Sequence, residues 1–561
     1  MDRTTLLIDD VALFWQELGM ETSLAILAAL ALTAAVVTLL FAKLRRGSFK
    51  QQQQKQQKSR SARHQRTQSK AEMQLYPLPS PPRLPIFGHV FSTPFVQPEK
   101  RFTEWSRALG PLFALDLGPT CRRPMIIVNS AKVAHDLFET RGARYSSRPY
   151  FHLWCDIIMP GSRGFLPTPY GDYLRKHRKL AHAGGLGPST VSKYADVIER
   201  ETAFLLRNLF LDVKLNGAAA GINPSNRFRH FSMNVMMSVI FGRRAETMED
   251  PEFKDSLRLT QELTALSGPE VMLIDMVPLL KYIPNPIMSK AKRLVALEKK
   301  VFKQLVGRVR EDIAAAERGE AEMPNCLAAY VVKNGEREGL DELDVEFLCG
   351  ALLGGGLETV GSTLCWLFAV LVHYPEVQEM AFKELNEVVG RDRLPSLEDE
   401  ASLPYIKAIV KEILRYRPPA PLAVPHSCNE DDVYNGYFIP KDSILMLNMD
   451  AIHFDGTVYK DPYTFDPSRF LDKKDGAPNA SRDHWGFGAG RRICIGMHLA
   501  ERELFLAIAR LLWSFRIDSV IGKEVDIHGG EGGLAFAPNP YRVRFIPRDD
   551  RLVSVLGSLQ A

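Results

Sequence analysis

The 561-residue sequence predicts a mainly helical domain with small β-sheets, preceded by a single amino-terminal transmembrane helix. Three observations support this fold class. Residues 22–42 are apolar and uncharged, several later stretches repeat apolar residues at the helical period, and strand-like runs are few and short. Hydrophobic residues make up 45% of the chain and charged residues 24%, which is ordinary for a globular protein that encloses a pocket.

The stretch from Thr22 to Ala42 has the length and composition of a membrane-spanning helix. At a rise of ~1.5 Å per residue it crosses roughly the ~30 Å hydrocarbon layer. A cleaved signal peptide requires a basic start, whereas residues 1–21 carry five acidic residues and one Arg. A buried soluble helix would show a polar face. Because Lys43, Arg45 and Arg46 follow directly, we expect a single pass, with residues 1–21 luminal and the catalytic part cytosolic.

Residues 43–74 have the composition of a basic, Gln-rich tether. Ten Lys or Arg and no acid occupy residues 43–70, so the net charge of +5 is concentrated there. Such a segment is typical of disorder and can contact anionic membrane lipid, whereas no nucleic-acid-binding motif is present. Residues 75–97 are rich in Pro and predict a stiff hinge that leads into one catalytic domain, residues 98–561.

Periodicity predicts the main elements of this domain. We expect helices over residues 194–213, 291–316, 346–373, 375–389 and 405–416, and strands over 112–117, 125–128, 444–447 and 541–545. The helix over 346–373 is very apolar, and three consecutive glycines, 354–356, interrupt it. Each glycine costs about 1 kcal/mol relative to Ala, so we expect something to approach the backbone there.

The seven cysteines are odd in number, scattered and without CxxC spacing, which indicates a reducing compartment and neither disulfides nor zinc. One of them, Cys494, lies within Phe-Gly-Ala-Gly-Arg-Arg-Ile-Cys-Ile-Gly, residues 487–496. Gly488 and Gly490 allow a tight turn that would bring N–H groups toward the sulfur. The apolar helical run from His498 would direct its amino-terminal dipole at the sulfur. A buried structural cysteine is the alternative for this position.

The complete pattern FxxGxRxCxG resembles the haem-binding signature of the cytochrome P450 family. The resemblance implies a cytochrome P450 fold and a haem b cofactor. Cys494 would be the axial thiolate ligand of the haem iron, Phe487 would shield the thiolate side of the ring, and Arg492 would pair a haem propionate.

Further motifs follow in the order of the family. Residues 355–359, Gly-Gly-Leu-Glu-Thr, resemble its oxygen-activation motif. In that role Gly355 and Gly356 leave room for O₂, Thr359 hydrogen-bonds the bound oxygen, and Glu358, in place of the commoner Asp, relays protons. The alternative for this motif is a glycine-softened core helix.

Charged residues supply the other matches. Glu412 and Arg415 resemble the ExxR pair that an Arg, here Arg469, completes for folding and haem-pocket integrity. Residues 170–179 resemble the WxxxR helix, so Arg178 would reach a propionate, although Leu174 stands at the aromatic position. His426 matches the position from which a His reaches the other propionate; a surface histidine is the alternative.

The resemblance covers residues 75–548 and implies a monooxygenase, an oxidoreductase that inserts one oxygen atom from O₂ into a lipophilic small molecule by hydroxylation or epoxidation. Because no flavin or nicotinamide motif is present, electrons from NADPH would come through a separate NADPH–cytochrome P450 reductase docked on the Cys494 side. We expect substrate walls from residues 145–169, 353–358, 420–424 and 533–537. The sequence resembles fungal microsomal members that tailor secondary metabolites, which implies the endoplasmic reticulum membrane.

Three other functions fit parts of the sequence. A haem-thiolate protein that rearranges peroxides needs neither O₂ nor a reductase, but such proteins often lose the acid and alcohol that Glu358 and Thr359 supply. A haem sensor would bind ligands without turnover. A membrane scaffold with chance motifs would contain no haem.

Overall fold

The computed structural model describes residues 76–85, 88–94, 96–117, 123–217, 219–267, 274–275, 281–282, 285–471, 482–531, 533 and 535–558. The predicted luminal segment, transmembrane helix and tether lie outside these residues and stay predictions. Within the described ranges, the helix Glu342–Leu371 is the one long and apolar enough to cross a membrane. Most of this helix is buried inside the protein, so it belongs to the core rather than to a membrane.

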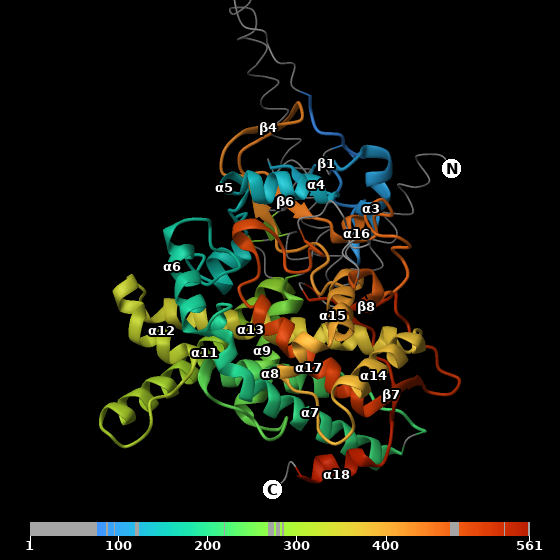
Figure 1. Cartoon of the computed structure of the whole chain (residues 1–561). Coiled ribbons are helices and arrows are strands. Elements are labelled where there is room, and N and C mark those ends of the chain that lie inside the picture. Colours follow the sequence, from blue (N-terminus) through green and yellow to red (C-terminus); the bar gives the residue numbers. More distant parts are fainter. Residues whose placement is uncertain are drawn as a thin grey trace, which may run out of the picture.

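Helices make up most of this structure, and the five predicted ones are present with small shifts at their ends (Figure 1). They are α7 (Ala195–Asn216), α11 (Pro286–Glu317), α13 (Glu342–Leu371), α14 (Pro375–Val388) and α15 (Pro404–Tyr416). Sequence periodicity missed α3 (Pro98–Leu109), α8 (Ser225–Phe241), α9 (Pro251–Ala265) and α12 (Leu327–Gly335). Helix α8 shows no apolar stripe because nearly its whole circumference is buried.

Small sheets complete the fold, and the largest lies with α3 and α4 (Ala131–Ala134) at the end of the molecule opposite α7 and α18 (Arg551–Ser558) (Figure 1). Its strand order is β1 (Leu112–Leu115), β2 (Met125–Val128), β6 (Ile444–Leu447) and β3 (His426–Ser427). Strands β2 and β6 pair in parallel and are buried at all four positions, which explains their continuous apolar sequence. The predicted strand 541–545 runs instead over Val543–Pro547 as β10, paired with β7 (Phe515–Ser519).

The central helix α13 is held at close range by its neighbours. A capping box between Asp341 and Asp344 starts the helix. A Cβ atom added to Gly350 would lie 2.1 Å from the Phe302 ring of α11, so two helices meet at this glycine. These contacts fix how α13 is rotated about its axis, which decides the side chains that it presents to the site.

The ExxR pair forms the network expected from the sequence. Arg415 donates from Nε and Nη2 to the two carboxylate oxygens of Glu412, both at 2.7 Å. Arg469, on the short helix η8 (Pro467–Phe470), donates from Nε to the same carboxylate at 3.2 Å. All three side chains are buried. Arg415 also donates from Nη1 to the main-chain oxygens of His453 and Pro462, at 2.8 and 2.9 Å, so the network ties α15 to the chain that precedes the cysteine segment.

Glu298 on α11 is a buried acid that this packing leaves unpaired. Neither of its carboxylate oxygens has a hydrogen-bond partner. Burial raises the pKa of its carboxyl from the ordinary value of 4.5 to about 8. Because the folded state favours the neutral acid, the stabilisation is complete below the unfolded pKa and is lost as the pH rises through the folded pKa.

Replacing Glu298 by Gln tests this assignment. Between about pH 5 and about pH 8 we expect the free energy of unfolding of the wild type to fall by up to ~1.4 kcal/mol per pH unit as the Glu298 carboxyl ionises. Glu298→Gln has no proton to lose at this position, so its free energy of unfolding should fall less. Thermal unfolding at several pH values measures the difference. Glu311→Gln, an exposed change on the same helix, should leave the pH dependence as it is; equal slopes for Glu298→Gln and wild type would contradict the assignment.

Candidate functional site

Cys494 lies between the short helix η9 (Gly490–Arg492) and α17 (Met497–Ser514). Its main-chain N–H donates to the Phe487 carbonyl at 2.9 Å, which closes the turn. Gly488 and Gly490 have φ of 73° and 56°, a left-handed conformation that favours glycine. A Cβ atom at position 490 would lie 1.9 Å from the Phe138 carbonyl, so this glycine admits the backbone of η1 (His135–Thr140).

The sequence predicted that Gly488 and Gly490 bring N–H groups toward the sulfur, but another residue supplies that contact. The backbone N–H of Gly496, at the start of α17, lowers the pKa of the Cys494 thiol, and the Arg178 cation acts in the same direction. Burial has the larger effect and raises the pKa. Gly490 therefore allows the close approach of η1, and the Gly496 N–H interacts with the sulfur.

The sulfur faces space inside the protein. Cys494 is exposed, whereas the five other free cysteines of the described chain are buried. Yet burial raises the pKa of its thiol, which shows that protein surrounds it on most sides. Exposure of the residue together with a pKa raised by burial is expected for a side chain that borders an internal space, where a ligand can reach the sulfur.

Three arginines converge near this segment, and no acid within the described residues forms a salt bridge with them. Arg492 donates from Nε to the Ser146 carbonyl at 2.7 Å and from Nη2 to the Thr168 carbonyl. Arg148 donates from Nη1 to the carbonyls of residues 424 and 425, at 2.8 and 2.7 Å, while its buried Nε has no partner. Arg178 donates from Nη2 to the Ile493 carbonyl at 2.9 Å.

The charges of these arginines repel one another. Burial lowers the pKa of Arg492 to about 10, with the Arg178 cation contributing. Burial also lowers the pKa of Arg148 well below its ordinary value, with the Arg492 and Arg178 cations contributing. No carboxylate in the described ranges forms a salt bridge with any of the three. Buried cations held only by carbonyls call for an anion from elsewhere.

His426 joins this cluster and is buried, which excludes the alternative of a surface histidine. Its Nδ1–H donates to the Tyr145 carbonyl at 2.7 Å, and its ring centroid lies 4.6 Å from that of Phe138. Burial, followed by the Arg148 charge, holds the pKa of the imidazole well below its ordinary value. The remaining nitrogen, Nε2, is the atom of the ring that stays free to meet a ligand.

These residues fit the haem that the resemblance implies. A thiol donor for iron is present at Cys494, and the cluster of Arg148, Arg492 and His426 lacks the negative charge that two propionates would bring. Sequence reasoning missed Arg148 and assigned residues 145–169 to the substrate. Carbonyls of this loop orient Arg492, and its Arg148 belongs to the cation cluster, while its role as a substrate wall stays a prediction. No motif in the sequence marked Arg148.

The glycines of α13 face different surroundings. Gly355 is exposed in the middle of this buried helix, and a Cβ atom there would meet nothing within 4 Å. A Cβ atom at Gly356 would lie 2.3 Å from Met236 Sδ of α8. The prediction that both glycines leave room for O₂ is therefore wrong for Gly356, which packs two helices together. Thr359 Oγ1 donates to the Gly355 carbonyl at 2.8 Å, which places its hydroxyl at the open turn.

Glu358, like Gly356, faces α8. Its Oε2 lies 3.8 Å from Arg229 Nε of α8, and its buried Oε1 has no hydrogen-bond partner. Burial raises the pKa of the carboxyl, and the Arg229 cation partly opposes this rise. The acid is thus adjacent to Thr359 in sequence and is held by an arginine that the sequence did not reveal.

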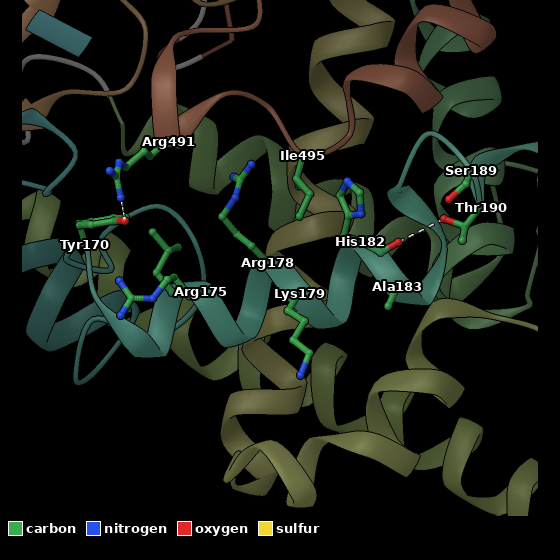
Figure 2. Close-up of a pocket in the computed structure, with 11 residues that line it drawn as sticks. Tyr170, Arg175, Arg178, Lys179, His182, Ala183, Ser189, Thr190, Arg491 and Ile495 are labelled. Carbon is green, nitrogen blue, oxygen red and sulfur yellow. Dashed lines mark hydrogen bonds between the residues drawn. The ribbon is translucent and has the colours of Figure 1, made fainter. Parts of the chain in front are cut away.

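A pocket of about 510 Å³ opens on the face that carries the cysteine segment. Arg491 and Ile495 extend from this segment toward α6 (Asp172–Ala181), and Arg178 extends from α6 toward them (Figure 2). Arg491 donates to the Tyr170 hydroxyl. No acidic side chain lines this pocket. Arg175 and Lys179 form ion pairs with Asp172 and Glu338 outside the lining, whereas Arg178 and Arg491 form none in the described structure, so the lining is basic. Leu174 lies in the pocket wall, at the position where the family motif has an aromatic residue.

Comparisons with known proteins agree with this geometry. The family model described as Cytochrome P450 matches residues 78–545. Cytochrome P450 monooxygenase 58 of Postia placenta is 32% identical over 86% of this chain and 91% of its own length. Cytochrome P450 monooxygenase fogE of Aspergillus ruber is 33% identical over 86% and 89%. A zebra fish cytochrome P450 solved with progesterone covers 81% of this chain and all of its own, with a TM-score of 0.68 and 25% identity.

The two glycines of α13 should respond differently to Ala. We expect Gly356→Ala to lower the free energy of unfolding by about 1–3 kcal/mol, because the methyl group collides with Met236. Gly355→Ala should raise it by up to about 1 kcal/mol through helix propensity, while its methyl group weakens carbon monoxide binding. Denaturant titration and ligand binding measure the two effects. Similar stability losses for both variants would show that the assignment of the two sides is wrong.

Arg148 should matter for haem retention rather than for folding. We expect Arg148→Met to release haem to an excess of apomyoglobin about tenfold faster, since a charged hydrogen bond contributes roughly 1.5–3 kcal/mol. The apoprotein should unfold at the same or a higher temperature, because a repelling cation is gone. Arg318→Met, on the surface, is the control. A variant that loses apoprotein stability and keeps its haem would contradict the assignment.

Proposed function

The chain belongs to the cytochrome P450 family, and we propose that it hydroxylates or epoxidises a lipophilic small molecule with one oxygen atom from O₂. It is a haem-thiolate monooxygenase, an oxidoreductase of this family. We assign the axial ligand to Cys494, which is exposed and whose thiol is influenced by Arg178, one of three clustered arginines that form no salt bridge in the described structure. This arrangement is the observation that carries the proposal.

Cysteine-ligated haem supplies O₂ activation, because electron density from the thiolate favours O–O cleavage. In our proposal the Gly496 N–H and the Arg178 cation would stabilise the thiolate bound to iron, because both lower the pKa of the thiol and partly oppose the larger effect of burial. Arg148, Arg492 and His426 hold the propionates, and Phe487 covers the thiolate side. The carbonyls that bind the guanidinium groups fix their directions before haem arrives.

Thr359 and Glu358 move protons in this proposal. The Thr359 hydroxyl lies at the open turn beside Gly355 and can hand a proton to an oxygen atom placed there. Glu358 holds a proton on its unpaired Oε1 more readily than an ordinary Glu does, because burial raises its pKa. Arg229 anchors the other oxygen, so a rotation of the carboxyl is needed to reach Thr359. General acid catalysis of this kind contributes about 10²–10⁴ in rate.

Electrons come from NADPH through a separate NADPH–cytochrome P450 reductase in this proposal. The basic pocket of α6 and the cysteine segment is the docking face, since Arg175, Lys179 and Arg491 are exposed and no acid lines it. An acidic partner would approach the Cys494 side with complementary charge. Arg178 and Ile495 line this pocket (Figure 2) and would face the partner.

The anchor and the substrate complete the proposal. The apolar residues 22–42 would cross the endoplasmic reticulum membrane once and hold the catalytic part on its cytosolic side, near lipophilic substrates. Tailoring of a secondary metabolite is the role that we propose, on the resemblance to fungal microsomal members. A peroxide-rearranging enzyme is disfavoured because the acid Glu358 and the alcohol Thr359 are both present, with the Thr359 hydroxyl at the open turn.

Reconstitution with isotopically labelled O₂ tests the reaction. We expect NADPH, reductase and labelled O₂ to place one labelled atom in the product of a lipophilic substrate identified by comparing metabolites of a deletion strain and its parent. Turnover with a peroxide alone would favour the rearranging enzyme. Cys494→Ala should abolish the ferrous carbon monoxide spectrum of thiolate-ligated haem; an unchanged spectrum would refute the assigned ligand.

Two threonines of α13 provide a matched comparison for the proton path. We expect Thr359→Ala to lower product formed per NADPH about tenfold or more, because the hydroxyl at the open turn is lost. Thr363 makes the same backbone hydrogen bond one turn later, to Thr359 at 2.8 Å, and is buried. Thr363→Ala should keep normal coupling. Equal losses in the two variants would assign Thr359 to helix structure alone.

A further inference from the structure

His453 joins the Glu–Arg–Arg network to the cysteine segment. It is the last residue of α16 (Met449–His453) and is fully buried. Its ring Nδ1–H donates to the Arg415 carbonyl at 2.8 Å, while its own carbonyl accepts from Arg415 Nη1 at 2.8 Å. Two hydrogen bonds to one arginine, from ring and backbone, fix the imidazole in position and in orientation.

The second ring nitrogen faces the cysteine segment. Trp485 donates its buried main-chain N–H to His453 Nε2 at 2.8 Å. The ring is therefore a neutral imidazole with its proton on Nδ1, since Nε2 accepts and a carbonyl can only accept from Nδ1. The two nitrogens therefore bind different segments. Nδ1 holds the ring against α15, and Nε2 holds the backbone of Trp485.

Trp485 in turn begins the turn that closes on the ligand. Its carbonyl accepts from the Gly488 N–H at 2.8 Å, and the carbonyl of the intervening Phe487 accepts from the Cys494 N–H at 2.9 Å. Hydrogen bonds thus run without a break from the Glu412–Arg415 pair through His453 to the backbone around Cys494. Sequence motifs for the pair and for the cysteine are known separately, but this connection between them comes from the fold.

We propose that His453 is a positioning residue, which holds the cysteine segment in register with the Glu412–Arg415–Arg469 network so that the Cys494 sulfur stays bound to iron. The inference rests on the role proposed for Cys494. Its physical basis is the buried Trp485 N–H, which has no other acceptor among its hydrogen bonds in the described structure. Without an acceptor this group would leave its place to find another partner, and the turn would shift with it.

Two amide substitutions separate the nitrogens of the ring. Gln places its amide near the position of Nε2 and can accept from Trp485, whereas Asn places its amide near Nδ1 and can only serve the Arg415 carbonyl. We expect His453→Gln to keep the thiolate-type carbon monoxide spectrum. His453→Asn should lose this spectrum in part of the molecules and should release haem to apomyoglobin about tenfold faster, as expected for a buried donor left unpaired.

Tyr459→Phe is the matched control, because the Tyr459 hydroxyl donates to the Asp483 carbonyl at 2.7 Å, two residues before Trp485. It should leave spectrum and haem release unchanged. Identical behaviour of His453→Gln and His453→Asn, or an equal change in Tyr459→Phe, would overturn the proposal. Failure of His453→Gln to fold would also overturn it, since the retained acceptor should suffice. A thiolate spectrum that survives in Cys494→Ala refutes the ligand assignment instead, so the two failures are distinguishable.

Discussion

An excess of positive charge in a dry interior is the constraint on which this structure depends. Arg148, Arg492 and Arg178 lie close enough to disturb one another, and backbone carbonyls are their hydrogen-bond acceptors in the described structure. Carbonyls orient a guanidinium group without cancelling its charge, so the apoprotein carries an electrostatic cost that an anionic ligand removes. Haem with two propionates meets this need, and the cysteine thiolate adds a further negative charge beside Arg178.

The fold meets the constraint by joining distant segments through backbone atoms. The loop near Ser146 and Thr168 supplies carbonyls to Arg492, η1 approaches Gly490 at its Phe138 carbonyl, and His453 links α15 to Trp485. Because main-chain groups do not change with substitution, these contacts tolerate variation in side chains. Arg492 and Gly490, which make these contacts through a side chain or through the lack of one, cannot be replaced in the same way. Both lie within the cysteine motif.

Much of the site could be predicted because its chemistry is encoded in short patterns. The cysteine segment and residues 355–359 of α13 are each a short pattern that spacing identifies. The Glu412–Arg415 pair is too short to be identified by itself and was assigned because it lies between these two patterns in the order of the family. Arg148, Arg229 and His453 could not be found in this way, since their partners are far away along the chain. Helix α8 was missed because burial on all sides removes the apolar stripe by which a helix is detected.

The prediction for the glycines of α13 was wrong at Gly356 for a geometric reason, and the same reason constrains the length of this helix. Successive residues of a helix differ by about 100° in direction, so Gly355 and Gly356 meet different neighbours, one open and one filled by Met236. One residue inserted upstream in α13 would turn Gly355 toward Met236, and one residue deleted there would turn Gly356 toward the open side. The number of residues between the start of α13 and Gly355 therefore sets which glycine borders the open space.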